Sequence, residues 1–282
     1  MKIYYIILFM FALLIIFFRW QNNAVEITTH EYINKKITKK FDGFKIIHVS
    51  DFHNKNFHGK LAAKIKEINP DIIVITGDLI DRRKTKMNIA ADFVKDIVKI
   101  APTYYVSGNH EQLSEHYNDL KKILRMLSVT IMDNSYTAII NDGYEIGLIG
   151  IADPAINFNK KSHLSENNSS YMRHNIKKLI RKSNSKFNML LSHRPEHMSE
   201  YSELGIDLVF CGHAHGGQIR IPFVGGVLSP NQGLFPKYSE GMHVVGTTSM
   251  IVSRGLGNSI FPFRVFNRPE LVVVTLKSEY TY

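Results

Sequence analysis

Five short runs of large apolar and β-branched residues constrain the fold of this chain more than any other feature, because each run ends in a turn that carries Asp, Asn or His. Apolar runs of this length, bounded by polar turns, are typical of buried strands. They lie at residues 45–49, 71–76, 103–106, 187–191 and 206–210. Helical spacing of apolar residues separates them, at residues 61–68, 89–100, 113–127 and 173–181. Alternating strands and helices predict an α/β domain whose site lies at the carboxyl ends of the strands.

The remainder of the domain is richer in strands. Residues 136–140 and 144–149 flank Asn141-Asp142-Gly143, a strong hairpin-turn signal. Further strands are predicted at 244–245, 251–252 and 271–276, whereas residues 153–170 read as a polar loop that could cap a site. We therefore expect a four-layer α/β/β/α sandwich of two mixed sheets flanked by helices.

The amino terminus is different in character. Residues 3–18 form an uninterrupted apolar run between Lys2 and Arg19, and Trp20 follows at the position of an interfacial aromatic. Sixteen helical residues span about 24 Å, slightly less than the ~30 Å hydrocarbon core, and snorkelling of Lys2 and Arg19 would close the gap. A cleaved signal peptide and a buried core helix are the alternatives, but the run has neither a small-x-small cleavage site nor a polar face.

These features predict one transmembrane helix before the α/β domain. The expected organisation is a membrane anchor at residues 1–20, a juxtamembrane segment at 21–41 and a catalytic domain at 42–282. Basic residues after the run, at positions 19, 35, 36, 39 and 40, outnumber Lys2 before it. The positive-inside rule then predicts a single-pass protein of the cell membrane whose domain faces the cytoplasm, with membrane lipids as partners of the anchor.

Composition excludes several classes of protein. The chain has one cysteine, Cys211, which excludes a disulfide framework and a zinc cage made of cysteines within one chain. A formal net charge of +10 favours polyanionic partners, such as phosphate esters, nucleic acid or anionic lipid headgroups.

The strand-end residues form a plausible ligand set for metal ions. Asp51 and His53 are two positions apart, so in extended backbone their side chains point the same way, and His213 and His215 repeat the spacing. The full set of candidate ligands is Asp51, His53, Asp78, Asn109, His193, His213 and His215. Oxygen and imidazole ligands without thiolate suit Mn²⁺, Fe or Zn²⁺. Seven ligands exceed the needs of one tetrahedral ion, but with one bridging carboxylate they suit two ions about 3.5–4 Å apart.

In its order of motifs, the chain resembles the calcineurin-like metallophosphoesterases. The motifs D-x-H, G-D, G-N-H-[DE], a lone His and G-H-x-H are all intact here and cover residues 42–282. They read Asp51-Phe52-His53, Gly77-Asp78, Gly108-Asn109-His110-Glu111, Ser192-His193 and Gly212-His213-Ala214-His215. Gly216-Gly217-Gln218 and Ser253-Arg254-Gly255-Leu256-Gly257 are similar to a membrane-anchored branch that includes an enzyme splitting UDP-2,3-diacylglucosamine at its pyrophosphate.

The resemblance implies a role for each matching residue. One ion would be held by Asp51, His53, Asp78 and His215. The second would be held by Asp78, Asn109, His193 and His213, so that Asp78 bridges the two. A hydroxide between the ions would attack phosphorus in line. His110 would protonate the leaving oxygen or contact the phosphate, oriented by a carboxylate such as that of Glu111.

The resulting hypothesis is a membrane-anchored phosphodiesterase or pyrophosphatase that acts on a phosphorylated, lipid-linked substrate. It would use two divalent ions, with Mn²⁺ expected and Fe or Zn²⁺ as alternatives. Arg254 and Arg194 are candidate substrate-binding residues, because guanidinium groups match phosphate oxygens. A nuclease or nucleotide phosphodiesterase of the same superfamily is one alternative, although no interleaving of aromatic and basic residues suits nucleic acid. A membrane-tethered binding protein without catalysis is the other.

Overall fold

Two six-stranded mixed sheets form the centre of the molecule. The computed structural model describes residues 2–155, 166–259 and 261–279. The first sheet has the order β1-β16-β2-β3-β4-β5, in which only the β16–β2 pair is antiparallel. Its strands are β1 (Glu26–Asn34), β16 (Glu270–Ser278), β2 (Lys45–Val49), β3 (Ile72–Thr76), β4 (Thr103–Val106) and β5 (Thr130–Ile131).

The second sheet has the order β14-β15-β9-β8-β7-β6, with antiparallel pairs at its two edges and parallel pairs between them. Its strands are β14 (Gly241–Val245), β15 (Thr248–Val252), β9 (Leu208–Cys211), β8 (Asn188–Leu191), β7 (Tyr144–Gly150) and β6 (Ser135–Asn141). The predicted hairpin is the β6–β7 pair, which turns at Asp142 and Gly143.

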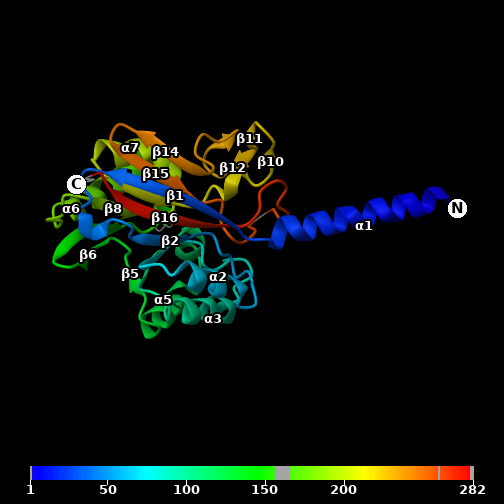
Figure 1. The fold of residues 1–282 in the computed structure, drawn as a ribbon, viewed down its shortest axis with the longest axis horizontal. Coiled ribbons are helices and arrows are strands. Elements are labelled where there is room, and N and C mark those ends of the chain that lie inside the picture. Colours follow the sequence, from blue (N-terminus) through cyan, green and yellow to red (C-terminus); the bar gives the residue numbers. More distant parts are fainter. Residues whose placement is uncertain (1, 156–165, 260, 280–282) are drawn as a thin grey trace.

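Helices cover the outer face of each sheet (Figure 1). The first sheet packs on α2 (Lys60–Ile68), α3 (Met87–Ile97) and α5 (Tyr117–Met126), and the second on α6 (Glu166–Ile180) and α7 (Met198–Glu203). Between the sheets lies a third apolar layer that includes Ile46, Val74, Leu148 and Phe210. The central strands are buried on both faces, which is why their sequences are continuously apolar rather than alternating. The predicted α/β/β/α sandwich is confirmed.

Short elements connect these layers. Two hairpins, β10–β11 and β12–β13, project from one end of the second sheet, beside the base of α1 (Figure 1). Their strands are β10 (Arg220–Ile221), β11 (Gly225–Gly226), β12 (Leu228–Ser229) and β13 (Gly233–Leu234). The other short elements are α4 (Asn109–Gln112), η1 (Lys39–Phe41), η3 (Pro195–His197) and η4 (His215–Gly217).

The segment predicted to be juxtamembrane contains a strand of the first sheet. β1 lies in residues 21–41 yet pairs in parallel with β16 along its whole length, from Glu26 opposite Glu270 to Asn34 opposite Ser278. As an edge strand it buries only Tyr32, so its sequence lacks the apolar run of the central strands. The folded domain therefore begins at β1, well before residue 42.

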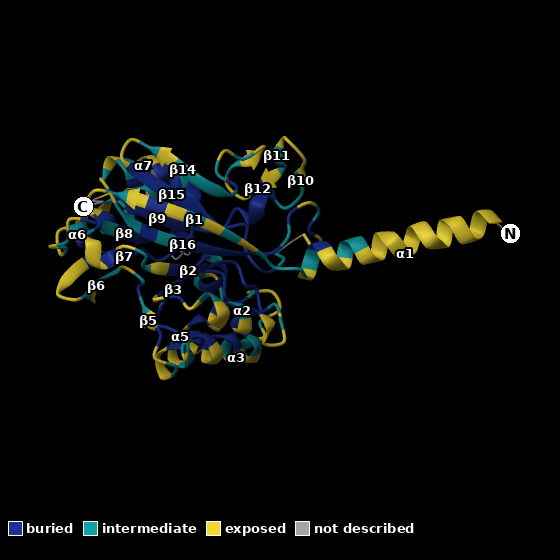
Figure 2. Ribbon diagram, in the orientation of Figure 1, coloured by how far each residue is buried: buried dark blue, intermediate teal, exposed yellow. Residues whose placement is uncertain are grey.

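The apolar amino-terminal run is a single helix, α1 (Lys2–Asn23), which extends from the body and is exposed over nearly all its length (Figure 2). By length and composition it can cross a membrane. The polar segment predicted as a loop at residues 153–170 is in part helical, because α6 begins at Glu166. Residues 156–165, the rest of the predicted cap, lie outside the described residues.

Candidate metal centre

The turns that follow β2, β3, β4, β8 and β9 meet at one edge of the sandwich, and the structure brings all seven predicted ligands together there. Each of these turns supplies one or two members of the set. Six of the seven side chains are buried, and only that of Asn109 is half-buried. This clustering follows from the topology, because neighbouring parallel strands end at the same edge of their sheet.

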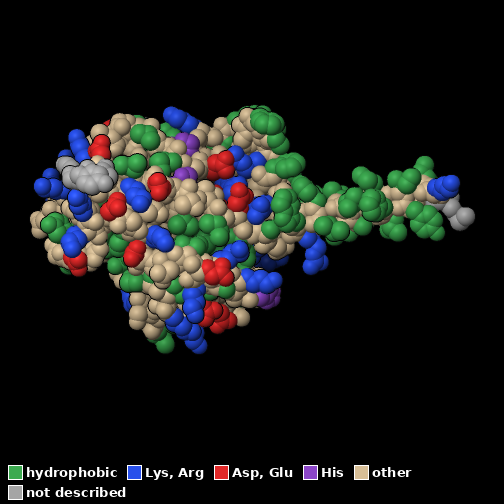
Figure 3. Space-filling view, in the orientation of Figure 1, with side chains coloured by type: hydrophobic (Ala, Val, Ile, Leu, Met, Phe, Trp, Pro, Cys, Tyr) green, Lys and Arg blue, Asp and Glu red, His purple; other side chains and the backbone are tan. Residues whose placement is uncertain are grey.

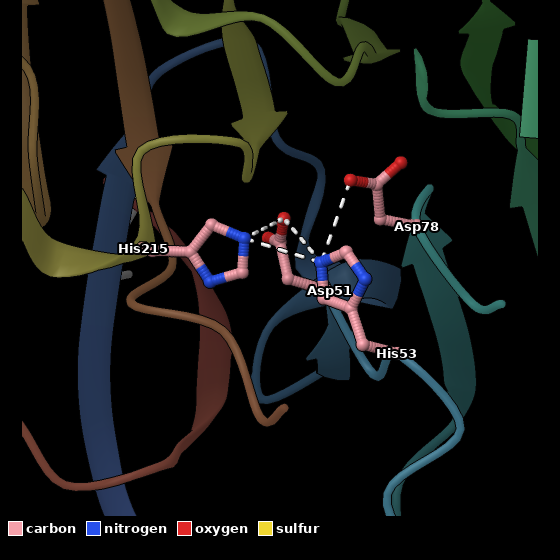
Figure 4. A group of neighbouring side chains, drawn as sticks. All are labelled: Asp51, His53, Asp78 and His215. Atoms are coloured by element: carbon pink, nitrogen blue, oxygen red, sulfur yellow. Dashed lines mark hydrogen bonds and ion pairs between the residues drawn. The ribbon is translucent and has the colours of Figure 1, made fainter. Parts of the chain in front are cut away.

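Four side chains converge in the first group (Figure 4). The Nε2 atoms of His53 and His215 are 3.2 Å apart. The Nε2 of His215 is 3.3 Å from Oδ1 of Asp51, and that of His53 is 3.5 Å from Oδ2 of Asp78. Two imidazole nitrogens and two carboxylate groups aimed at one point form a donor set that fits a divalent transition-metal ion.

The second group shares Asp78 with the first. The Nε2 of His193 is 3.4 Å from Oδ2 of Asp78, 3.2 Å from Oδ1 of Asn109 and 3.2 Å from Nδ1 of His213. The backbone carbonyl of Thr76 lies 2.7 Å from Nδ1 of His193 and orients its ring. A metal-ligating histidine usually donates its other ring N–H to a carbonyl or carboxylate oxygen in this way. The carboxylate of Asp78 thus faces both groups.

Backbone conformation at the site differs from the expectation. Asp51 and His53 have φ of 50° and 46°, and His213 and His215 have φ of 66° and 49°, so neither pair lies in extended backbone. The strands end before these residues, and left-handed turns direct the side chains inward instead. Positive φ is uncommon for non-glycine residues, although Asp and His adopt it more readily than most.

Burial sets the protonation state of several imidazoles. It lowers the pKa of His53 to about 3 and that of His213 to about 4, and it also lowers the pKa of His215. These three rings are therefore neutral near pH 7, which is the form that binds metal ions. His193 differs: burial opposes its protonation, but the carboxylates of Asp78, Asp51 and Asp153 together outweigh burial and raise the pKa of His193 to about 10.

His110 lies beside the first group, with its ring centroid 4.5 Å from that of His53. The carboxylate that faces it belongs to Asp81, whose Oδ1 is 3.6 Å from the Nδ1 of His110. Burial opposes protonation of His110, but the charges of Asp78 and Asp81 raise its pKa. Asp81 is not among the residues predicted from the sequence.

Glu111 has a different position from the predicted one. Its carboxylate accepts hydrogen bonds from the backbone N–H groups of Asp78 (2.8 Å), Ile80 (2.9 Å) and Gly108 (2.8 Å). It is fully buried and holds the turns after β3 and β4 together. The oxygens of Glu111 are thus directed at backbone donors, whereas Asp81 places a carboxylate oxygen 3.6 Å from the Nδ1 of His110, which accepts a hydrogen bond from the backbone N–H of Arg82.

Arg194 lines a pocket together with Asp78, His110, His213 and His215. Its guanidinium forms two hydrogen bonds with Asp153, at 2.7 and 3.0 Å, and one each with Glu196 and Asn231. Within the described part of the chain, these bonds occupy all but one of the five guanidinium N–H donors.

Asn231 also lines this pocket and lies between β12 and β13. Its Oδ1 is 3.0 Å from Nε2 of His213 and accepts a hydrogen bond from Arg194 at 2.9 Å. Sequence reasoning missed Asn231, since a Pro-Asn turn far from every motif carries no distinguishing signal.

Arg254, the other predicted substrate-binding residue, is not among the residues that line the pocket. Its Nη2 is 3.1 Å from both Glu26 and Glu270, and its Nε is 3.5 Å from Glu240. The side chain is buried among these three carboxylates. Arg254 therefore joins β1 to β16 behind the His215 turn.

Comparison with known proteins agrees with this geometry. Residues 44–217 match the family of calcineurin-like phosphoesterases. The chain is 32% identical to the uncharacterized metallophosphoesterase YkuE of Bacillus subtilis, over 91% of this chain and 87% of that protein. It is 27% identical to phosphodiesterase YaeI of Escherichia coli, over 83% of this chain and 82% of that protein. The crystal structure of TT1561 from Thermus thermophilus shares the fold, with a TM-score of 0.50 and 13% identity over 76% of this chain and 90% of that one. The chain therefore belongs to the calcineurin-like phosphoesterases and is a metal-dependent phosphoester hydrolase.

Proposed function

We propose that the protein is a membrane-anchored phosphoesterase that binds two divalent metal ions. Asp51, His53, Asp78 and His215 would hold one ion, and Asp78, Asn109, His193 and His213 would hold the other. The position of the Asp78 carboxylate between the two groups carries this proposal, since Oδ2 lies 3.5 Å from His53 and 3.4 Å from His193.

Two divalent ions, when bound, lower the pKa of water and stabilise charge on the phosphoryl oxygens. Mn²⁺ is the expected metal and Fe or Zn²⁺ the alternatives, since the ligand atoms are oxygen and imidazole nitrogen. The second ion would use Nδ1 of His213, because Nε2 of that ring is directed at Asn231.

The chain's own residues would bind the phosphate and handle a proton. His110 lines the pocket, and its raised pKa, supported by Asp78 and Asp81, suits donation of a proton to the leaving oxygen. Arg194 is held rigidly by Asp153 and Asn231, and its remaining N–H could contact a phosphate oxygen.

The proposed substrate is a phosphodiester or pyrophosphate with a lipid part, such as UDP-2,3-diacylglucosamine. This proposal rests on α1, whose exposed apolar length would confine the site to a membrane surface. The excess of basic residues after α1 supports a cytoplasmic position of the domain.

The test is an assay of the purified full-length protein with Mn²⁺, on bis-p-nitrophenyl phosphate and on UDP-2,3-diacylglucosamine, with metal content measured in parallel. The variant is Asp78→Asn, and the matched control is the exposed Asp142→Asn, because both residues have positive φ, which Asn tolerates. We expect about two ions per chain and turnover of both substrates, lost in Asp78→Asn only.

Other outcomes would contradict separate parts of the proposal. Turnover of the artificial diester alone would remove the lipid pyrophosphate as substrate and leave the two-metal chemistry standing. One ion per chain in an active protein would contradict the bridging role of Asp78.

A further inference from the structure

An exposed apolar surface lies at the end of the body from which α1 emerges (Figures 1 and 3). It consists of Phe223 and Val224 in the β10–β11 hairpin, Leu234 and Phe235 in and after β13, and Phe263 and Phe266 in the segment between β15 and β16. We name these six residues the apolar shelf. Phe223 is fully exposed, and the other five side chains are between 52% and 69% exposed. Exposure of so many large apolar side chains in one region indicates a binding surface.

The shelf is continuous with α1. The Phe266 ring lies 5.7 Å from that of Phe17, and the Phe263 ring lies 5.6 Å from that of Phe18. Phe266 also shares a surface hollow with Phe223 and Val224, so the contact with α1 extends to the β10–β11 hairpin.

The depth of these contacts follows from helix geometry. The guanidinium of Arg268 lies 5.0 Å from the ring of Trp20. Tryptophan is enriched at the level of the lipid headgroups, so Trp20 marks that level on α1. Phe17 precedes Trp20 by three residues, so it lies about 4.5 Å further along the helix, toward the bilayer centre. Phe266 packs on Phe17, so its side chain lies at the depth of Trp20 or closer to the bilayer centre.

Two of the three segments that form the shelf also adjoin the pocket over the metal centre. Asn231, between β12 and β13, and Ser259, in the segment before Phe263, each line that pocket. If the body is oriented so that the shelf lies in lipid, the pocket therefore lies beside the lipid headgroups.

We propose that the apolar shelf enters the headgroup region of the bilayer that α1 crosses, so that the body rests on the membrane rather than standing away from it on a stalk. The occupant of the shelf is lipid, because Phe263 and Phe266 pack directly on Phe18 and Phe17 of α1 and so extend its apolar surface onto the body. This inference rests on the proposed role of α1 as an anchor, but not on the identity of the substrate. A lipid-linked phosphate could then enter the pocket while its acyl chains stay in the membrane.

Fluorescence quenching in proteoliposomes tests the proposal. Trp20 is the single tryptophan of the chain, so Trp20→Phe provides a silent background. Phe223→Trp and Leu234→Trp each report on one hairpin of the shelf. Ile140→Trp is the matched control, because Ile140 is 70% exposed and lies in β6, at the opposite end of the body from α1 (Figure 1). The full-length variants are reconstituted into phosphatidylcholine/phosphatidylglycerol vesicles with or without bromine on the acyl chains near the headgroups.

We expect bromine to quench the emission of the Phe223→Trp and Leu234→Trp variants to an extent comparable with Trp20 in the unmodified chain, and to leave the Ile140→Trp variant unaffected. Quenching of Trp20 alone would overturn the shelf contact while the anchor stands. No quenching at any of these positions would overturn the anchor as well. Blue-shifted but unquenched emission at both hairpins would mean that a protein surface covers the shelf, which also overturns the proposal. Phosphoesterase activity enters none of these readings, so failure here is distinguishable from failure of the proposed function.

Discussion

Replacing Glu111 separates its structural role from the catalytic role that its place in the Gly-Asn-His-Glu motif suggests. The carboxylate accepts three hydrogen bonds from buried backbone N–H groups, those of Asp78, Ile80 and Gly108. Each buried donor left without a partner costs about 1–3 kcal/mol, so Glu111→Ala should cost about 3–9 kcal/mol. A domain is typically stable by only about 5–15 kcal/mol, so this variant should be close to unfolding.

Glu111→Gln is the graded counterpart. Its amide oxygen can still accept from Asp78 and Gly108, which share one carboxylate oxygen, but its NH₂ group would face the N–H of Ile80. One donor is then lost, and the expected cost is about 1–3 kcal/mol. Urea unfolding followed by circular dichroism measures both costs, with metal content determined on the same samples. If Glu111→Gln unfolds at the urea concentration of the unmodified protein yet turns over no substrate, the structural account is refuted and Glu111 handles a proton.

Three further predictions concern the metal centre. A Cβ at Gly108 would lie 2.2 Å from Oδ1 of Asp78, so Gly108→Ala should displace that carboxylate by about 1 Å and lower turnover about 100-fold, with loss of bound metal. Gly143→Ala, where a Cβ has no neighbour within 4 Å, should cost stability alone, and equal metal loss in both variants would contradict the steric argument. His110→Ala should lower kcat about 10²–10⁴-fold at unchanged metal content, as measured by elemental analysis, whereas metal loss would make it a ligand. Chelation should abolish turnover and lower the unfolding temperature, because a ligand at 100 times its Kd stabilises a fold by about 2.7 kcal/mol; an unchanged unfolding temperature would mean that the ions bind too weakly to support the site.

The sequence was sufficient for the central strands and the seven clustered residues because both are encoded locally. Strands buried on both faces are rich in β-branched and large apolar or aromatic residues, and the predicted runs 45–49 and 103–106 match β2 and β4 in full. Polar residues directly after such strands must then meet at the sheet edge, whatever the detailed backbone. For this reason the clustering was predictable although the extended conformation assumed for Asp51 and His53 was wrong.

The features that could not be predicted from the sequence depend on contacts between segments that are distant in the chain. β1 is specified by pairing with β16 more than 240 residues away, and its own pattern is that of an exposed edge. Arg254 has the residue type of a phosphate ligand, but carboxylates from Glu26, Glu240 and Glu270 surround it. Adjacency in sequence suggested Glu111 as the partner of His110, whereas neighbouring residues of the short helix α4 point in different directions.

The end of α1 is connected to the metal centre through two buried side chains, those of Gln21 and Asn267. The Oε1 of Gln21 accepts a hydrogen bond from the backbone N–H of Asn267 at 3.2 Å, and the Nδ2 of Asn267 donates to the carbonyl of His215 at 2.7 Å. Gln21→Ala should leave the buried N–H of Asn267 unpaired, at a cost of about 1–3 kcal/mol. Asn267 relieves this cost by shifting, and the shift moves the His215 turn.

We therefore expect Gln21→Ala to weaken metal binding although it removes no ligand, and calorimetric titration of the metal-stripped protein with Mn²⁺ measures the change. The control is Asn23→Ala, because among the described residues the exposed Asn23 side chain bonds only to the carbonyl of Arg19 in its own helix. Equal affinity in the two variants would show that α1 is a passive tether. Weaker binding in Gln21→Ala alone would mean that α1 helps to position His215, so that detaching the body from this helix would alter the metal centre itself.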